Sequence, residues 1–114
     1  MSKVDSFRCQ PVPRHFDAVR FPNGGQSQIK IREWVKQHGG EANLYDGWVR
    51  ETTEPADDGS YYRWDFISIG VKGKKYHSRH AYYGDYIIHR GDGDFIVVTP
   101  WEYDDFYEDV SRDV

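Results

Sequence analysis

The sequence predicts a small α+β domain with a mostly antiparallel sheet of about five to six strands, one main helix and a short C-terminal helix. Three observations lead to this prediction. Two runs rich in β-branched and aromatic residues, 86–88 and 95–98, flank the turn sequence Gly91-Asp92-Gly93, which is typical of a β-hairpin. Apolar residues recur at helical spacing within residues 26–38. Finally, Thr99-Pro100-Trp101-Glu102 has the pattern of a capping box with proline at the first helical position.

The first elements follow from local patterns. Residues 1–13 hold two prolines and little periodicity, which indicates an extended N-terminal arm, and residues 14–21 predict a first strand. We expect Ser27 to cap the main helix, which should end at Gly39-Gly40. The predicted buried face of this helix consists of Ile31, Trp34, Val35 and His38.

The rest of the domain, which should span residues 14–110, is expected to be strands, a loop and the short helix. The predicted segments are residues 44–49 (strand or hairpin), 51–60 (mobile polar loop), 61–71 and 74–81 (strands), 100–108 (helix) and 111–114 (end of an acidic tail). Both runs of the hairpin are continuously apolar, so we expect two central strands that are covered on both faces. The side chains expected to be buried are Ile31, Trp34, Val35, Ile87, Ile88, Phe95, Val97 and Phe106.

The composition indicates a binding surface. Hydrophobic content is only 38%, yet nine Tyr and four Trp exceed what one small core needs, so some rings should lie at the surface. Such rings suit a ligand or partner, although amphipathic rings also line strand edges in proteins without one. The formal net charge of −4 argues against binding of long nucleic acids by overall charge. A domain of this size would also gain from burying surface in a homo-oligomer.

Cysteine usage and hydropathy bear on the compartment. Cys9 is the single cysteine, so no internal disulfide can form, which is typical of a reducing compartment. No apolar run approaches the roughly 18 residues that a membrane span needs, and no signal-peptide core follows Met1. We therefore expect a cytoplasmic protein that does not engage a membrane.

The C-terminal motifs resemble a family of small phage and prophage proteins. The motifs are Gly84-Asp85-Tyr86-Ile87-Ile88, Gly93-Asp94-Phe95, Pro100, Tyr103, and Tyr107-Glu108 with Val110. In the family, a Gly-Asp-aromatic-Ile-Ile strand precedes Gly-Glu-Phe and a Pro-Asp-x-Phe-x-x-x-Tyr-Glu ending. The similarity runs without gaps over residues 84–110, with Asp94 in place of Glu and Tyr103 in place of Phe.

The start of the chain adds to this resemblance, since residues 7–8, 11 and 17–21 are similar to the family's opening strand, whereas residues 41–82 are not covered. The resemblance implies a bacteriophage accessory protein in the host bacterial cytoplasm. The family has no established catalytic residues, so it assigns no site.

Metal and catalytic patterns are weak. His77 and His80, with His89 or Asp85 as a third ligand, are candidate metal ligands, but an i, i+3 pair on a strand points to opposite faces. Adjacent acids such as Asp104-Asp105 do not converge on one point of a helix. The sequence also has no HxH, GxSxG or Walker-type pattern. We therefore predict no catalytic residues, no metal site and no cofactor, and expect a protein that is not an enzyme.

The segment 72–90 combines cations with aromatic rings. A nucleotide needs positive charge for its phosphate and a flat ring for its base, and only this segment supplies both. On a strand, Lys75, His77 and Arg79 share the more positive face, although a bulge would exchange the faces. The predicted ligand contacts are Lys75, His77, Arg79 and Arg90 for phosphate, and Tyr82 or Tyr83 for stacking. The plainer alternative is a glycine turn with solvated lysines.

Three functions fit a phage protein of this kind. The favoured one is a counter-defence binding protein that sequesters a nucleotide-type host immune signal, because the chain is small, rich in aromatics and basic in the middle. The second is an inhibitor that binds a host defence protein through exposed aromatics and the acidic tail. The third is a small structural component of the virion.

Overall fold

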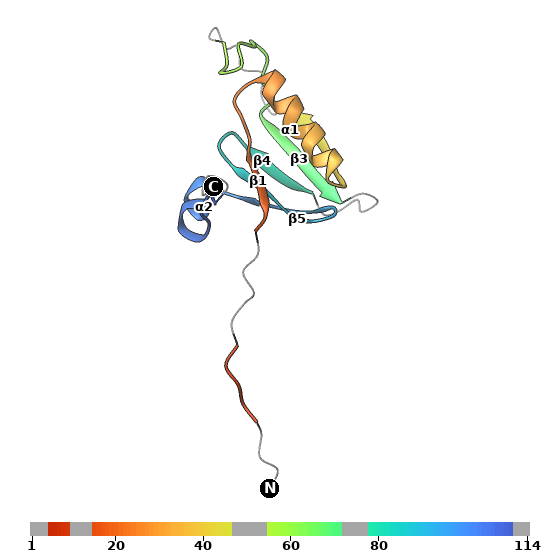
Figure 1. Ribbon diagram of the computed structural model, residues 1–114. Coiled ribbons are helices and arrows are strands. Elements are labelled where there is room, and N and C mark those ends of the chain that lie inside the picture. The colour runs from red at the N-terminus through yellow and green to blue at the C-terminus, as the bar shows by residue number, and fades with distance from the viewer. Residues whose placement is uncertain (1–4, 10–14, 47–54, 72–77, 111–114) are drawn as a thin grey trace.

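The computed structural model describes residues 5–9, 15–46, 55–71 and 78–110 of the 114-residue chain (Figure 1). Its elements are β1 (Asp17–Arg20), α1 (Gly25–Gln37), β2 (Gly40–Tyr45), β3 (Phe66–Val71), β4 (Arg79–Tyr82), β5 (Tyr86–Gly91), β6 (Asp94–Val98) and α2 (Pro100–Phe106). Within these residues, the α+β class, the two helices and the number of strands are confirmed. Residues 5–9, within the predicted arm, are exposed and form neither helix nor strand.

The strands form two antiparallel sheets of three strands, in the orders β1-β5-β6 and β2-β3-β4. The chain passes from one sheet to the other at the turn between β4 and β5. There Gly84 has a φ of 92°, a conformation that side-chain-bearing residues rarely adopt. The chain passes between the sheets a second time across α1, which lies between β1 and β2.

A shared core joins α1 to the inner faces of both sheets. Val35 of α1, Ile67 of β3 and Ile87 of β5 have no exposed surface. The core consists of Phe21, Val35, Ala42, Ile67, Ile69, Ala81, Ile87 and Phe95. Complete burial of one large apolar side chain contributes about 1.5–3 kcal/mol, so this cluster is the main force that holds both sheets to one helix.

Most of the predicted core is confirmed. The predicted side chains that are buried are Val35, Ile87, Ile88 and Phe95. Those that are partly buried and pack against the core are Ile31, Trp34 and Val97. Strand β5 is central and buries Ile87 and Ile88 on its two faces, as expected, whereas β6 lies at the edge of its sheet.

The prediction that Phe106 is buried is wrong, because this side chain is 80% exposed. Helix α2 begins with the predicted capping box, and it turns Tyr103 toward the sheet. The ring of Tyr103 stacks on Tyr86 with centroids 3.9 Å apart, and Tyr107 stacks on Tyr103. These stacked tyrosines occupy the side of α2 that faces the sheet, so Phe106 lies on the side that faces solvent. Figure 1 shows α2 and α1 on opposite sides of β1.

The N-terminus of α1 is capped from a distant part of the chain. The N-cap residue is Gly24, and the prediction that Ser27 caps the helix is wrong. Asp58 instead accepts a hydrogen bond from the backbone N–H of Ser27 at 2.7 Å. It also accepts from the hydroxyl and the backbone N–H of Ser60, at 2.6 and 2.9 Å. These hydrogen bonds, led by that of the Ser60 side chain, hold the pKa of Asp58 well below its usual range.

A buried polar side chain on α1 forms hydrogen bonds with two other segments of the chain. Gln28 is only 1% exposed. Its amide nitrogen donates to the carbonyls of Pro22 and Trp64 at 3.1 and 3.0 Å, and its oxygen accepts from the Trp64 N–H at 2.8 Å. Gln28 therefore joins the segment after β1 to the segment before β3.

Several expectations concern residues outside the described part of the chain. These are the strand or hairpin beyond residue 46, the loop at 51–54, the basic strand at 74–77 and the tail at 111–114. Of the predicted mobile loop, residues 55–60 are described, and Asp58 ties them to α1. Neither described helix is long and apolar enough to cross a membrane.

Replacing Gln28 by Ala should lower the free energy of unfolding by about 1–3 kcal/mol, because it leaves the part-buried Trp64 N–H without an acceptor. Urea unfolding measures this loss. Gln26→Ala is the matched control, since Gln26 is exposed two residues earlier in the same helix and should change stability by less than about 0.5 kcal/mol. Equal losses in the two variants would contradict the bridging role of Gln28.

Asp58 should make the stability depend on pH. Because its pKa is lower in the folded state, its contribution is fully present above the unfolded pKa of about 3.9 and is lost as the pH falls through the folded pKa. Asp58→Asn should therefore be less stable than the wild type at pH 7, by a difference that shrinks below about pH 4. Urea unfolding at a series of pH values tests this, with Asp57→Asn as control; a difference that stays constant with pH would rule out the linkage.

Candidate functional site

The outer face of the sheet β2-β3-β4 carries the strongest candidate site. Inward residues such as Ala42, Ile67 and Ala81 are buried against α1, so the residues that alternate with them point away from the core. The outward residues on three neighbouring strands are Asn43, Tyr45, Phe66, Ser68, His80 and Tyr82. Tyr45 and Tyr82 are 46% and 52% exposed, which shows that no described element covers this face.

Four of these side chains, Tyr45, Phe66, His80 and Tyr82, form what we call the aromatic face. Tyr45 pairs with Phe66, which pairs with Tyr82, so three rings lie side by side across three strands. The Phe66 centroid is 5.4 Å from each tyrosine ring and 4.6 Å from His80. The result is an open platform of touching rings.

A polar row lies beside these rings. Asn43, Ser68 and His80 are partners on the same three strands, one step along the sheet from the tyrosines. Their amide, hydroxyl and imidazole groups can donate and accept hydrogen bonds. The face thus offers stacking surface next to groups that can bind the polar edge of a ring.

The residues of the predicted nucleotide site are only partly brought together. Tyr82 belongs to the aromatic face, and Tyr83 is 62% exposed in the turn that follows β4. Arg79 is exposed too, but strand alternation places it on the face of β4 opposite Tyr82. Arg79 lines a cavity of about 120 Å³ together with Asp94 and Phe95.

The other predicted phosphate contacts add little to the aromatic face. Arg90 lies on β5 of the other sheet and donates to the Asp94 carboxylate at 3.1 Å, so its charge is already paired. Lys75 and His77 lie outside the described residues. The phosphate contacts therefore stay a prediction.

Sequence reasoning did not find Tyr45 and Phe66. The segment 61–71 is apolar at nearly every position, so it did not reveal which side chains face outward. The alternation of Ile67 and Ile69 with Phe66 and Ser68 was the available signal, but it requires knowing where the strand begins.

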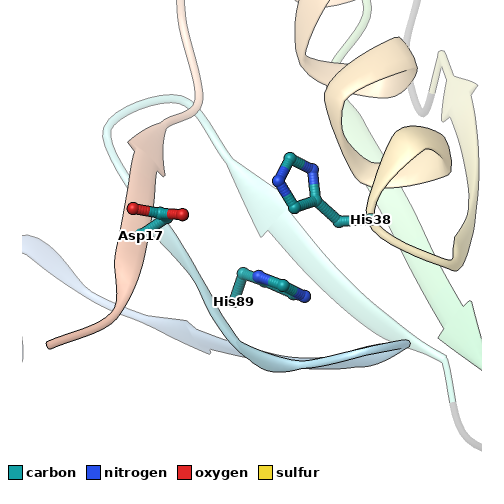
Figure 2. Close-up of side chains that lie close together, drawn as sticks. All are labelled: Asp17, His38 and His89. Carbon is teal, nitrogen blue, oxygen red and sulfur yellow. The ribbon is translucent and has the colours of Figure 1, made fainter. Parts of the chain in front are cut away.

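A second cluster lies on the inner face of the other sheet (Figure 2). Asp17 of β1, His38 after the end of α1, and His89 of β5 each offer a possible ligand atom, and these atoms lie within 4.8 Å of one another. His80 and Asp85, considered above with His89, do not belong to this group. Local spacing could not reveal the cluster, because its members are far apart in the sequence.

No family model, curated protein or solved structure that we compared with this chain matches it. The resemblance to small phage proteins therefore stays a prediction. The arguments about function rest on the geometry of the described residues.

Proposed function

We propose that this chain is a non-enzymatic binding protein whose aromatic face stacks on the base of a nucleotide-type ligand. The observation that supports the proposal is the open row of Tyr45, Phe66 and Tyr82 across three strands. The rings of Tyr45 and Phe66 stack on each other at an interplanar angle of 21°, so the π-surface available to a planar ligand is that of the exposed Tyr45 and Tyr82.

Physical chemistry favours a base as the partner of such a face. Stacking of a base on an aromatic side chain contributes about 1–3 kcal/mol, and every base has a flat π-surface. Asn43, Ser68 and His80 lie beside the rings, where they can bind the edge of a stacked base. Ring pairs across strands also stabilise a sheet by about 0.2–1 kcal/mol without any ligand, so the experiment must separate binding from stability.

The proposed biological role follows from the resemblance to phage accessory proteins. A phage protein that binds a nucleotide without turning it over would sequester a host immune signal. This role requires binding in the host bacterial cytoplasm and no chemical change of the ligand. Chromatography of nucleotides after incubation with the protein checks the second requirement, since product formation would contradict a sequestering role.

Replacing Tyr82 by Ala should weaken nucleotide binding roughly five- to hundredfold, because it removes one stacking ring. Calorimetric titration with cyclic and ADP-ribose-type nucleotides measures the affinity. The matched control is Tyr61→Ala, since Tyr61 is 69% exposed and does not belong to the aromatic face. Arg79→Ala and Arg90→Ala test the phosphate contacts in the same titration.

Urea unfolding of each variant shows whether the sheet is intact. The proposal fails if the wild type binds none of these nucleotides at micromolar concentration. It also fails if Tyr82→Ala binds as tightly as the wild type, or if Tyr61→Ala loses as much affinity as Tyr82→Ala.

A specific observation supports inhibition of a host protein as the second candidate function. Helix α2 exposes Trp101 by 68% and Phe106 by 80%, next to the acidic Glu102, Asp104 and Asp105. Exposed aromatic side chains of this size are typical anchors of protein interfaces. If the chain binds a host protein in this way, Trp101→Ser should weaken the complex more than tenfold, whereas Tyr82→Ala should leave it unchanged.

A further inference from the structure

We propose that Asp17, His38 and His89 form a binding site for a divalent transition-metal ion such as Zn²⁺. The site is independent of the aromatic face, which lies on the other sheet. Two imidazoles and one carboxylate are a ligand set that Zn²⁺ and neighbouring first-row ions prefer. Figure 2 shows the three side chains close together, on two strands and a helix end.

The backbone holds two of the ligands directly opposite each other. Asp17 of β1 pairs with His89 of β5 in the antiparallel register. The Cβ atoms of such a pair lie about 4.5–5.5 Å apart on the same face of the sheet. Because β5 is the central strand of its sheet, His89 is fixed between two neighbouring strands.

The third ligand is held by the end of α1. The backbone carbonyl of His38 accepts a hydrogen bond from the N–H of Gly93 at 2.9 Å. Gly93 lies in the hairpin between β5 and β6, which also carries His89. Gly39 has a φ of 88°, and a Cβ there would collide with the Asp92 carboxylate. This close approach keeps His38 next to the strand of His89.

The ring of His38 is oriented as in many metal sites. Its Nδ1 lies 2.8 Å from the carbonyl oxygen of Trp34. A carbonyl can only accept, so Nδ1 carries the hydrogen and the neutral ring has its lone pair on Nε2. Metal-ligating histidines commonly donate their other N–H to a backbone carbonyl in this way. In Figure 2 a ring nitrogen of His38 is turned toward Asp17.

The ring of His89 has one nitrogen inside the protein and one nearer to Asp17. Its Nε2 is buried, and no described group forms a hydrogen bond with it. A buried ring nitrogen without a partner is rare in folded proteins. The ring contacts His38 edge-to-face at 4.6 Å and lies 5.1 Å from the Phe95 ring, so it forms part of a largely apolar wall. The nitrogen of this ring that lies nearer to Asp17 in Figure 2 is Nδ1, so Nδ1 is the atom that His89 would offer to the ion.

Charge and size also suit a cation. The carboxylate of Asp17 is negative, and the C-terminal end of a helix such as α1 carries partial negative charge. Ligand atoms that bind one Zn²⁺ at about 2.0–2.2 Å lie roughly 3.3 Å apart. The ligand atoms of the three side chains must therefore move toward one another by roughly 1 Å or more to bind one ion. The exposed side chain of Asp17 can make this movement. Three protein ligands leave the remaining coordination position to water.

The bound ion would join β1, β5 and the end of α1 at one point. Because the unfolded chain does not hold these three residues together, binding should stabilise the folded state. The ion would therefore act as a clamp that fixes the first strand to the core hairpin.

The test uses the full chain stripped of metal with a chelator and then titrated with Zn²⁺ by calorimetry. We expect one Zn²⁺ per chain at micromolar or tighter affinity, and NMR signals of the ring nitrogens of His38 and His89 that shift on binding. Asp17→Asn, an exposed and conservative change, should weaken binding at least tenfold, as should His38→Ala. His80→Ala is the matched control and should bind as the wild type does, because His80 lies on the aromatic face.

Three results would overturn the proposal. One is a wild type that binds no Zn²⁺ at micromolar concentration. Another is binding that Asp17→Asn and His38→Ala leave unchanged. The third is a ring-nitrogen shift at His80 in place of His38 and His89, which would show adventitious binding to an exposed histidine. Because Asp17 is exposed, Asp17→Asn remains informative even if a histidine variant fails to fold.

Discussion

Helix α1 packs on the inner faces of both sheets, and the rest of the structure depends on this packing. Val35 lies in the shared core, and Gln28 bonds to the chain segments on either side of the helix. Because α1 packs on both sheets, apolar side chains fill the two inner faces. No described element packs on the outer face of β2-β3-β4. The exposed rings of that face are therefore a direct consequence of how the core is built.

Local patterns in the sequence predicted the elements but not how they meet. The helical spacing around Val35, the turn at 91–93 and the capping box at Thr99 act within a few residues, so these features could be predicted. The cap at Asp58 and the position of Phe106 depend on contacts between distant segments, so those predictions failed. The division into two sheets has the same cause, since β-strand partners are set by the whole chain.

The candidate sites also depend on contacts between distant segments, so local patterns could not predict them in full. Sequence reasoning found Tyr82 as a stacking residue, but the rings that extend it, Tyr45 and Phe66, become neighbours only through strand register. Asp17 and His89 likewise face each other because β1 pairs with β5. Asp17, His38 and His89 lie on the inner face of one sheet, whereas the aromatic face points outward from the other sheet, so the two proposed sites are separate.

The central claim is that the outer face of β2-β3-β4 is the binding surface of this protein. Backbone amide NMR signals recorded during a titration with a cyclic dinucleotide test it most directly. The account predicts that the shifted signals map to Tyr45, Phe66 and Tyr82 and their neighbours on the same face, while the signals of α2 stay in place. Shifts concentrated on α2, or on the strand that carries Arg90, would contradict it.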